Sequence, residues 1–88
     1  MARFLGQKLS DICGQSVVID NRAGGNVGAE FVARSAPDGY TLLLTAPGPL
    51  AVNPSLFPHL AFDPAADFAP VALVASVQIV LTVNPAVK

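Results

Sequence analysis

The residues best suited to hold a small ligand lie in the run Thr45-Ala46-Pro47-Gly48-Pro49, directly after an apolar stretch over residues 41–45. The Thr45 hydroxyl and the backbone N–H groups of Ala46 and Gly48 are donors, and a following helical turn adds the partial positive charge of its N-terminus. Ligands of open α/β sheets bind beyond the carboxyl ends of the strands. We therefore predict a carboxylate site at Thr45, Ala46, Gly48 and Pro49, with a Pro/Gly loop that binds nothing as the alternative.

A glycine-rich turn, Ala-Gly-Gly-Asn-Val-Gly, spans residues 23–28 between a predicted strand and a predicted helix. It is one glycine short of the dinucleotide-binding fingerprint, which also requires an acid at the end of the next strand. No acid lies between Asp38 and Asp63. The favoured interpretation is a turn that lets the helix pack closely, and the alternative is a nucleotide-binding enzyme fragment that uses Gly25 and Gly28.

The other reactive side chains do not indicate catalysis. His59 is the only histidine, shares a loop with two aspartates, and has no obvious nucleophile to complete a triad. Cys13 is the only cysteine, so no internal disulfide forms, and we expect it to be a small core residue. Arg22 could pair with a carboxylate ligand, although a salt bridge with Asp20 is the simpler expectation. We predict a binding protein with no cofactor, no metal and no enzymatic activity.

Alternating strands and helices must position these residues. Residues 17–20 and 41–45 are predicted strands, and residues 26–35 between them are a predicted helix. A strand without polar alternation is usually covered on both faces, as parallel sheets require. The connection is long enough for a helical crossover, which is nearly always right-handed. The sequence therefore predicts an α/β fold with a mainly parallel sheet.

Further elements flank this unit. Residues 3–13 carry apolar side chains at helical spacing, and Gly14 follows as a stop signal. The turn Ala-Pro-Asp-Gly over residues 36–39 ends the second helix because Pro37 cannot continue it. The remaining predicted elements are a short helical turn at 50–56, an irregular loop at 57–67, and strands at 71–74 and 79–83.

Composition excludes several classes of protein. The chain has 88 residues, 52% hydrophobic and 12% charged, with a formal net charge of −1, which argues against disorder and against nucleic-acid binding. So little polar surface suggests that the chain packs against something more. Residues 68–87 are uncharged, but Pro70, Gln78, Asn84 and Pro85 interrupt them, so we expect buried strands and not a membrane span. The first residues lack the pattern of a secretory signal peptide.

Several short motifs follow one another along nearly the whole chain. They are Gln7-Lys8-Leu9, Gly14-Gln15-Ser16-Val17-Val18-Ile19-Asp20-Asn21-Arg22, Gly24-Gly25-Asn26-Val27-Gly28-Ala29-Glu30, Ala36-Pro37-Asp38-Gly39-Tyr40-Thr41-Leu42-Leu43, Asn53-Pro54-Ser55-Leu56 and Asp67-Phe68-Ala69-Pro70-Val71. In this order they resemble the Bug family, the solute-binding proteins of tripartite tricarboxylate transporters. The ordered series is far more specific than any one motif.

The resemblance implies a periplasmic, two-lobed Venus-flytrap receptor with a type II periplasmic-binding-protein fold. Such a receptor closes on a small carboxylate or amino-acid solute and delivers it to membrane transporter subunits without chemistry. It also implies that residues 1–88 are a partial first lobe, lacking the first strand and nearly all of the second lobe, and that residues 45–49 match a pocket loop. Weak affinity in this short form is expected. The further alternative is a truncated remnant without function, which would aggregate.

Overall fold

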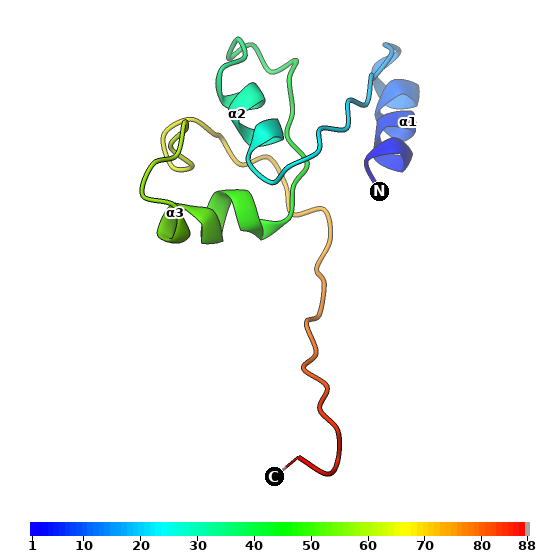
Figure 1. Cartoon of the computed structure of the whole chain (residues 1–88). Helices are drawn as coiled ribbons and strands as arrows, with labels where there is room; N and C mark the ends of the chain where they lie inside the picture. Colours follow the sequence, from blue (N-terminus) through cyan, green and yellow to red (C-terminus); the bar gives the residue numbers. More distant parts are fainter. Residues whose placement is uncertain (88) are drawn as a thin grey trace.

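The computed structural model describes residues 1–87, and its regular elements are all helical (Figure 1). Their bounds are Ala2–Cys13 for α1, Val27–Ala33 for α2, Gly48–Val52 for the π-helix η1, and Asn53–Leu56 for α3. The helix predicted at 3–13 is therefore confirmed. Within the described residues, no helix is long and apolar enough to cross a membrane.

Helix α1 ends as its sequence predicts. Gly14 adopts the left-handed conformation (φ +67°), and its N–H donates to the Ser10 carbonyl at 3.0 Å. The chain then turns back along the helix, because the Val17 N–H donates to the Ser10 hydroxyl at 2.9 Å. Gly6 is buried against this returning segment, where an added Cβ would lie only 2.9 Å from Ile19 Cδ1. Residues 17–19 are thus packed on α1.

Helix α2 is shorter than the predicted range of 26–35. Asn26 occupies the N-cap position, and the helix ends at Ala33, close to Pro37. A residue before proline disfavours helical backbone, so the last turn stops early. The Ser35 hydroxyl donates to the Phe31 carbonyl at 2.8 Å instead of extending the helix. The predicted turn follows, with the Tyr40 N–H donating to an Asp38 carboxylate oxygen at 3.0 Å.

The helical turn predicted at 50–56 begins two residues earlier, at Gly48. Pro49 lies in the first turn, where its missing N–H costs nothing and its fixed φ suits a helix. The first five residues form a π-helical turn, and the α-helical turn α3 continues without a break to Leu56. Two of the predicted ligand residues, Gly48 and Pro49, therefore lie inside a helix and not in a loop before it.

The predicted parallel sheet is not confirmed. No strand is present in residues 1–87, and residues 17–20, 41–45, 71–74 and 79–83 have no regular secondary structure. No backbone hydrogen bond in this part of the chain joins two of these four segments. The physical reason is that a helix satisfies its own backbone groups, whereas a strand exists only when a neighbouring strand accepts and donates its hydrogen bonds. Each segment here runs without such a neighbour.

The buried core is small and lies entirely within residues 1–68. Among the described hydrophobic side chains only Ala29 and Phe62 are buried, and the Phe62 ring packs edge-on against Phe68 at 5.8 Å. Residues 69–87, which we call the apolar tail, are all exposed and extend away from the helices (Figure 1). The radius of gyration is accordingly 16.4 Å, against about 12 Å for a compact chain of this length.

Candidate functional site

The predicted ligand residues lie where residues 41–45 give way to a helix. Thr45 and Ala46 are exposed, Gly48 is half-buried and Pro49 is buried. The Ala46 N–H and the Thr45 hydroxyl have no hydrogen-bond partner within residues 1–87. The loop therefore presents a hydroxyl and a backbone donor to solvent.

A helix N-terminus lies directly behind these donors. Segments η1 and α3 run on from each other, so Gly48 opens a continuous helical stretch that ends at Leu56. The positive end of such a stretch favours a negative charge beside it. No acidic side chain occurs in the first turn of either segment to satisfy that end locally. The arrangement therefore places neutral hydrogen-bond donors beside the positive end of a helix, which suits an anionic group.

The glycine-rich turn lies beside the same helix. Gly24 has a positive φ of +95°, and the Val27 N–H donates to its carbonyl at 3.3 Å. The side chain of Asn53, at the junction of η1 and α3, donates to the Asn26 side-chain oxygen at 2.6 Å. A Cβ added at Gly25 would lie 3.8 Å from Asn53 Nδ2. The structure thus places the glycine-rich turn against Asn53, which follows the segment η1 that begins at Gly48.

Asn53 was missed as a site residue by sequence reasoning. It entered only as part of the motif Asn53-Pro54-Ser55-Leu56. Nothing local in the sequence indicates its partner, which lies 27 residues away. The residue types give no signal either, because Asn84 also precedes a proline and makes only a local bond.

Arg22 makes the predicted ion pair, with its Nε 2.9 Å from an Asp20 carboxylate oxygen. Its guanidinium also lies over the Phe31 ring, 3.6 Å from the ring centre. Arg22 and Phe31 border a shallow hollow that is also lined by Glu30 and Arg34, which form an ion pair at 2.8 Å. Because each arginine is matched by a carboxylate, the hollow carries no net positive charge for an anionic ligand.

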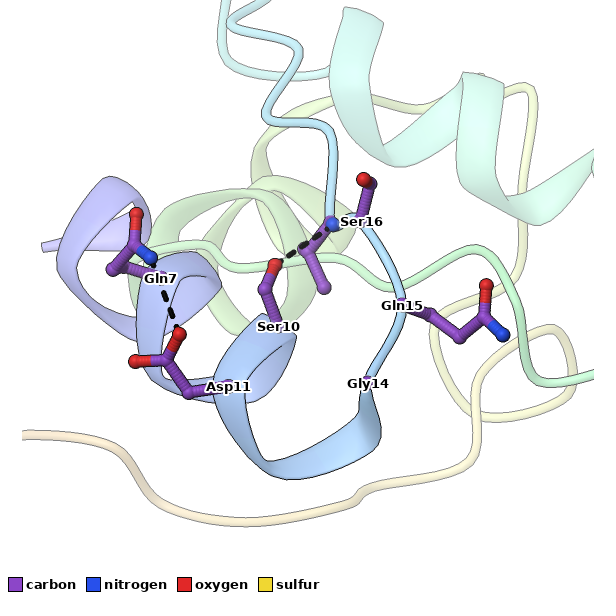
Figure 2. Close-up of a pocket in the computed structure, with 7 residues that line it drawn as sticks. Gln7, Ser10, Asp11, Gly14, Gln15 and Ser16 are labelled. Carbon is purple, nitrogen blue, oxygen red and sulfur yellow. Dashed lines mark hydrogen bonds between the residues drawn. The ribbon is translucent and has the colours of Figure 1, made fainter.

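A second hollow lies at the C-terminal end of α1 (Figure 2). It is lined mainly by polar side chains, among them Gln7, Asp11 and Gln15, and the Gln7 amide donates to Asp11 at 3.3 Å. The hollow is wide open to solvent, and none of the predicted ligand residues lines it. Its polar groups are those of an exposed helix end and do not indicate a ligand.

The remaining candidates make structural contacts or none. Asp63 and Asp67 bind the backbone of their own loop, with the Asp63 N–H donating to Asp67 at 2.7 Å. Within residues 1–87, no three His, Cys, Asp or Glu side chains group together as metal ligands. The prediction that Cys13 is a core residue is wrong, because it is exposed. It lies beyond the part of α1 that residues 17–19 cover.

Comparison with known proteins places the chain in a family. Residues 1–88 match the model of the tripartite tricarboxylate transporter family receptor. The chain is 47% identical over 91 residues to protein BugT of Bordetella pertussis, an alignment that covers 100% of the chain and 28% of that protein. It is 40% identical over 85 residues to a UPF0065 protein from the tcbD–tcbE intergenic region of Pseudomonas sp. strain P51, covering 94% of the chain and 25% of that protein.

A third relative, a UPF0065 protein of Agrobacterium vitis, is 41% identical over 83 residues, covering 92% of the chain and 24% of its own length. The chain therefore belongs to the tripartite tricarboxylate transporter receptor family, as the ordered motifs predicted. It spans about a quarter of the length of these curated relatives. No solved structure matches it. The family is one of binding receptors with a periplasmic-binding-protein fold, and it does not favour the nucleotide-binding alternative.

Proposed function

We propose that the chain is part of the first lobe of a periplasmic solute receptor, where it forms one side of a site for a small carboxylate or amino-acid solute. The observation that carries this proposal is the match of the whole chain to the receptor family. The family description supports binding without chemistry, and it suggests the membrane subunits of a tripartite transporter as partners. The chain spans about a quarter of the length of these relatives, which supports its forming only part of such a receptor.

The parallel sheet belongs to the same proposal. Residues 17–19 already pack on α1 through Ile19, which lies against Gly6, and a Cβ added at Gly28 in α2 would lie 4.0 Å from Leu43 Cδ1. These two approaches support an arrangement in which α1 and α2 lie against the segments, as crossover helices lie against the strands of a parallel sheet. We expect residues 17–20 and 41–45 to become strands when neighbouring strands satisfy their backbone groups.

The solute contacts we propose are the Thr45 hydroxyl and the N–H groups of Ala46 and Gly48. All three lie at the start of the helical stretch that begins at Gly48, where a carboxylate is electrostatically favoured. Pro49 contributes by fixing the backbone of the first helical turn, in which it is buried. A small carboxylate is the ligand that this set of neutral donors suits best.

An amide NMR titration of the 88-residue chain tests this function. Citrate, succinate, glutamate and NAD are added separately, and we expect the carboxylates to shift the peaks of Thr45, Ala46 and Gly48. Thr45→Val removes one hydrogen bond to a charged group and should weaken binding by roughly tenfold or more, since such a bond contributes about 1.5–3 kcal/mol. Thr82→Val makes the same change in the exposed tail and serves as the control.

Two results would contradict the proposal. Shifts at Gly25 and Gly28 with NAD, and none with the carboxylates, would indicate a nucleotide site. Equal affinities of the Thr45→Val and Thr82→Val variants for a carboxylate would show that the Thr45 hydroxyl does not contact the solute. Both substitutions replace a hydroxyl by a methyl group, so a difference in affinity between the two variants reports on the Thr45 hydroxyl.

A further inference from the structure

One side-chain hydrogen bond ties together two distant parts of the sequence. Asn53 Nδ2 donates to Asn26 Oδ1 at 2.6 Å across a separation of 27 residues, and the contact is partly buried. Every other side-chain hydrogen bond in residues 1–87 joins residues at most seven positions apart. The Asn26–Asn53 link is therefore the one polar tertiary contact of this kind in the described chain.

Asn26 gives up a local hydrogen bond to make this contact. An asparagine at the N-cap normally accepts from a backbone N–H in the first turn of its own helix. Asn26 occupies the N-cap of α2, but its side chain makes no such bond. Its oxygen instead accepts from Asn53. The Asn26 side chain thus joins α2 to the helical stretch that contains Asn53, and it does not cap α2.

The π-turn of η1 brings Asn53 to this position. The Asn53 N–H donates to the Gly48 carbonyl, which closes a turn one residue wider than an α-helical turn. The extra residue rotates the later residues of the helical stretch by about 100° around its axis. The Asn53 side chain consequently lies over Gly25, with α2 beside the helical stretch that contains η1 and α3 (Figure 1). Asn53 is tied to Gly48 through its backbone and to Asn26 through its side chain.

We propose that Asn26 and Asn53 are positioning residues that hold the glycine-rich turn and η1 together and so fix the orientation of the Gly48 N–H for the solute. The part that concerns the solute rests on the function proposed above, whereas the link to Gly48 does not. Loss of either side chain would remove the hydrogen bond that joins the end of η1 to the glycine-rich turn. The Gly48 donor would then sample orientations that a bound carboxylate cannot use.

Four variants of the 88-residue chain test the link: Asn26→Ala, Asn53→Ala, the double variant and Asn26→Asp. In ligand-free amide spectra both single alanine variants should shift the Gly48 peak, and the double variant should shift it no further. Affinity for the carboxylate that the wild type binds best should fall about fivefold in each single variant and not further in the double, as for one hydrogen bond. Asn26→Asp should restore both properties, because its carboxylate accepts from Asn53 Nδ2.

Asn84→Ala is the matched control, because Asn84 also makes a side-chain hydrogen bond, but only to the N–H of Ala86. It should leave the Gly48 peak and the affinity unchanged. An unmoved Gly48 peak in Asn26→Ala, additive effects in the double variant, or an Asn26→Asp variant that behaves like Asn26→Ala would overturn the proposal. A wild-type chain that binds no carboxylate would overturn the proposed function instead, and the ligand-free spectra would still decide the link.

Discussion

Residues 1–67 and the apolar tail differ in what their apolar side chains contact. The first region holds every helix of the described chain, both buried hydrophobic residues and the Asn26–Asn53 link. The tail is at least as apolar and has no charged residue, yet every residue in it is exposed. Hydrophobicity drives burial only when a complementary surface is within reach. The tail lacks that surface in this chain, and its backbone lacks a neighbouring strand.

This contrast between the two regions predicts that the apolar tail controls the association of one copy of the chain with another. A long, uncharged, β-branched segment with unpaired backbone groups is a template for pairing with another chain. Replacing Leu73 and Leu81 by Ser removes two side chains that are each 88% exposed. Since burying such a side chain contributes about 1.5–3 kcal/mol, the association constant should fall by more than about tenfold. Sedimentation velocity in reducing buffer measures this without cross-linking through the exposed Cys13.

The control for that experiment lies on α1. Phe4 and Ile12 are 68% and 80% exposed, so their replacement by Ser removes comparable apolar surface from the helical region. This variant should associate much as the wild type does. If the two double variants lower association equally, exposed apolar surface in general causes it, and the tail has no special role.

A second prediction concerns the small core of the first region. Phe62→Ala removes a buried ring and its edge-on contact with Phe68, and should lower the free energy of unfolding by about 3 kcal/mol. Phe57→Ala, in the same loop but half exposed, should cost far less. Urea unfolding followed by far-UV circular dichroism compares the two. If both variants lost the same free energy of unfolding, residues 1–67 would have no specific core and would resemble the apolar tail.

The same contrast explains what could be predicted from the sequence. Helix α1, the Asp38 turn and the Asp20–Arg22 pair were predicted correctly because each depends on residues at most a few positions apart. The four strands were not formed, because a strand depends on a partner that local sequence does not specify. Cys13 was wrongly assigned to a core because an apolar stripe shows which face of a helix could be buried, not how much of it is covered.

The candidate site was likewise predictable only in its local features. The donors at Thr45, Ala46 and Gly48 follow from residue type and from the end of an apolar run, and their role in binding stays a prediction. The earlier start of the helix at Gly48 was missed, since Pro49 was interpreted as part of a loop although it suits a first helical turn. Asn53 was missed because its contact crosses 27 residues.

The smallest change in stability is expected where a side chain orders a local turn, at Asp63 in the first region and at Asn84 in the apolar tail. Asp63 accepts hydrogen bonds from the N–H groups of Ala65 and Ala66 at 2.9 and 3.2 Å, beside the buried Phe62. Asp63→Ala should therefore lower the free energy of unfolding by about 1 kcal/mol, as the loss of a capping side chain does. Asp63→Asn keeps an acceptor oxygen and should recover most of that loss.

Asn84 makes a local bond of the same type in the tail, accepting from the Ala86 N–H at 2.9 Å. Asn84→Ala should not change the free energy of unfolding, because no packed structure depends on that turn. A local hydrogen bond stabilises a fold only when the turn it orders is coupled to something buried, as the turn after Asp63 is coupled to Phe62. A measurable loss in Asn84→Ala by urea unfolding would show that the tail is packed against the helical region in solution.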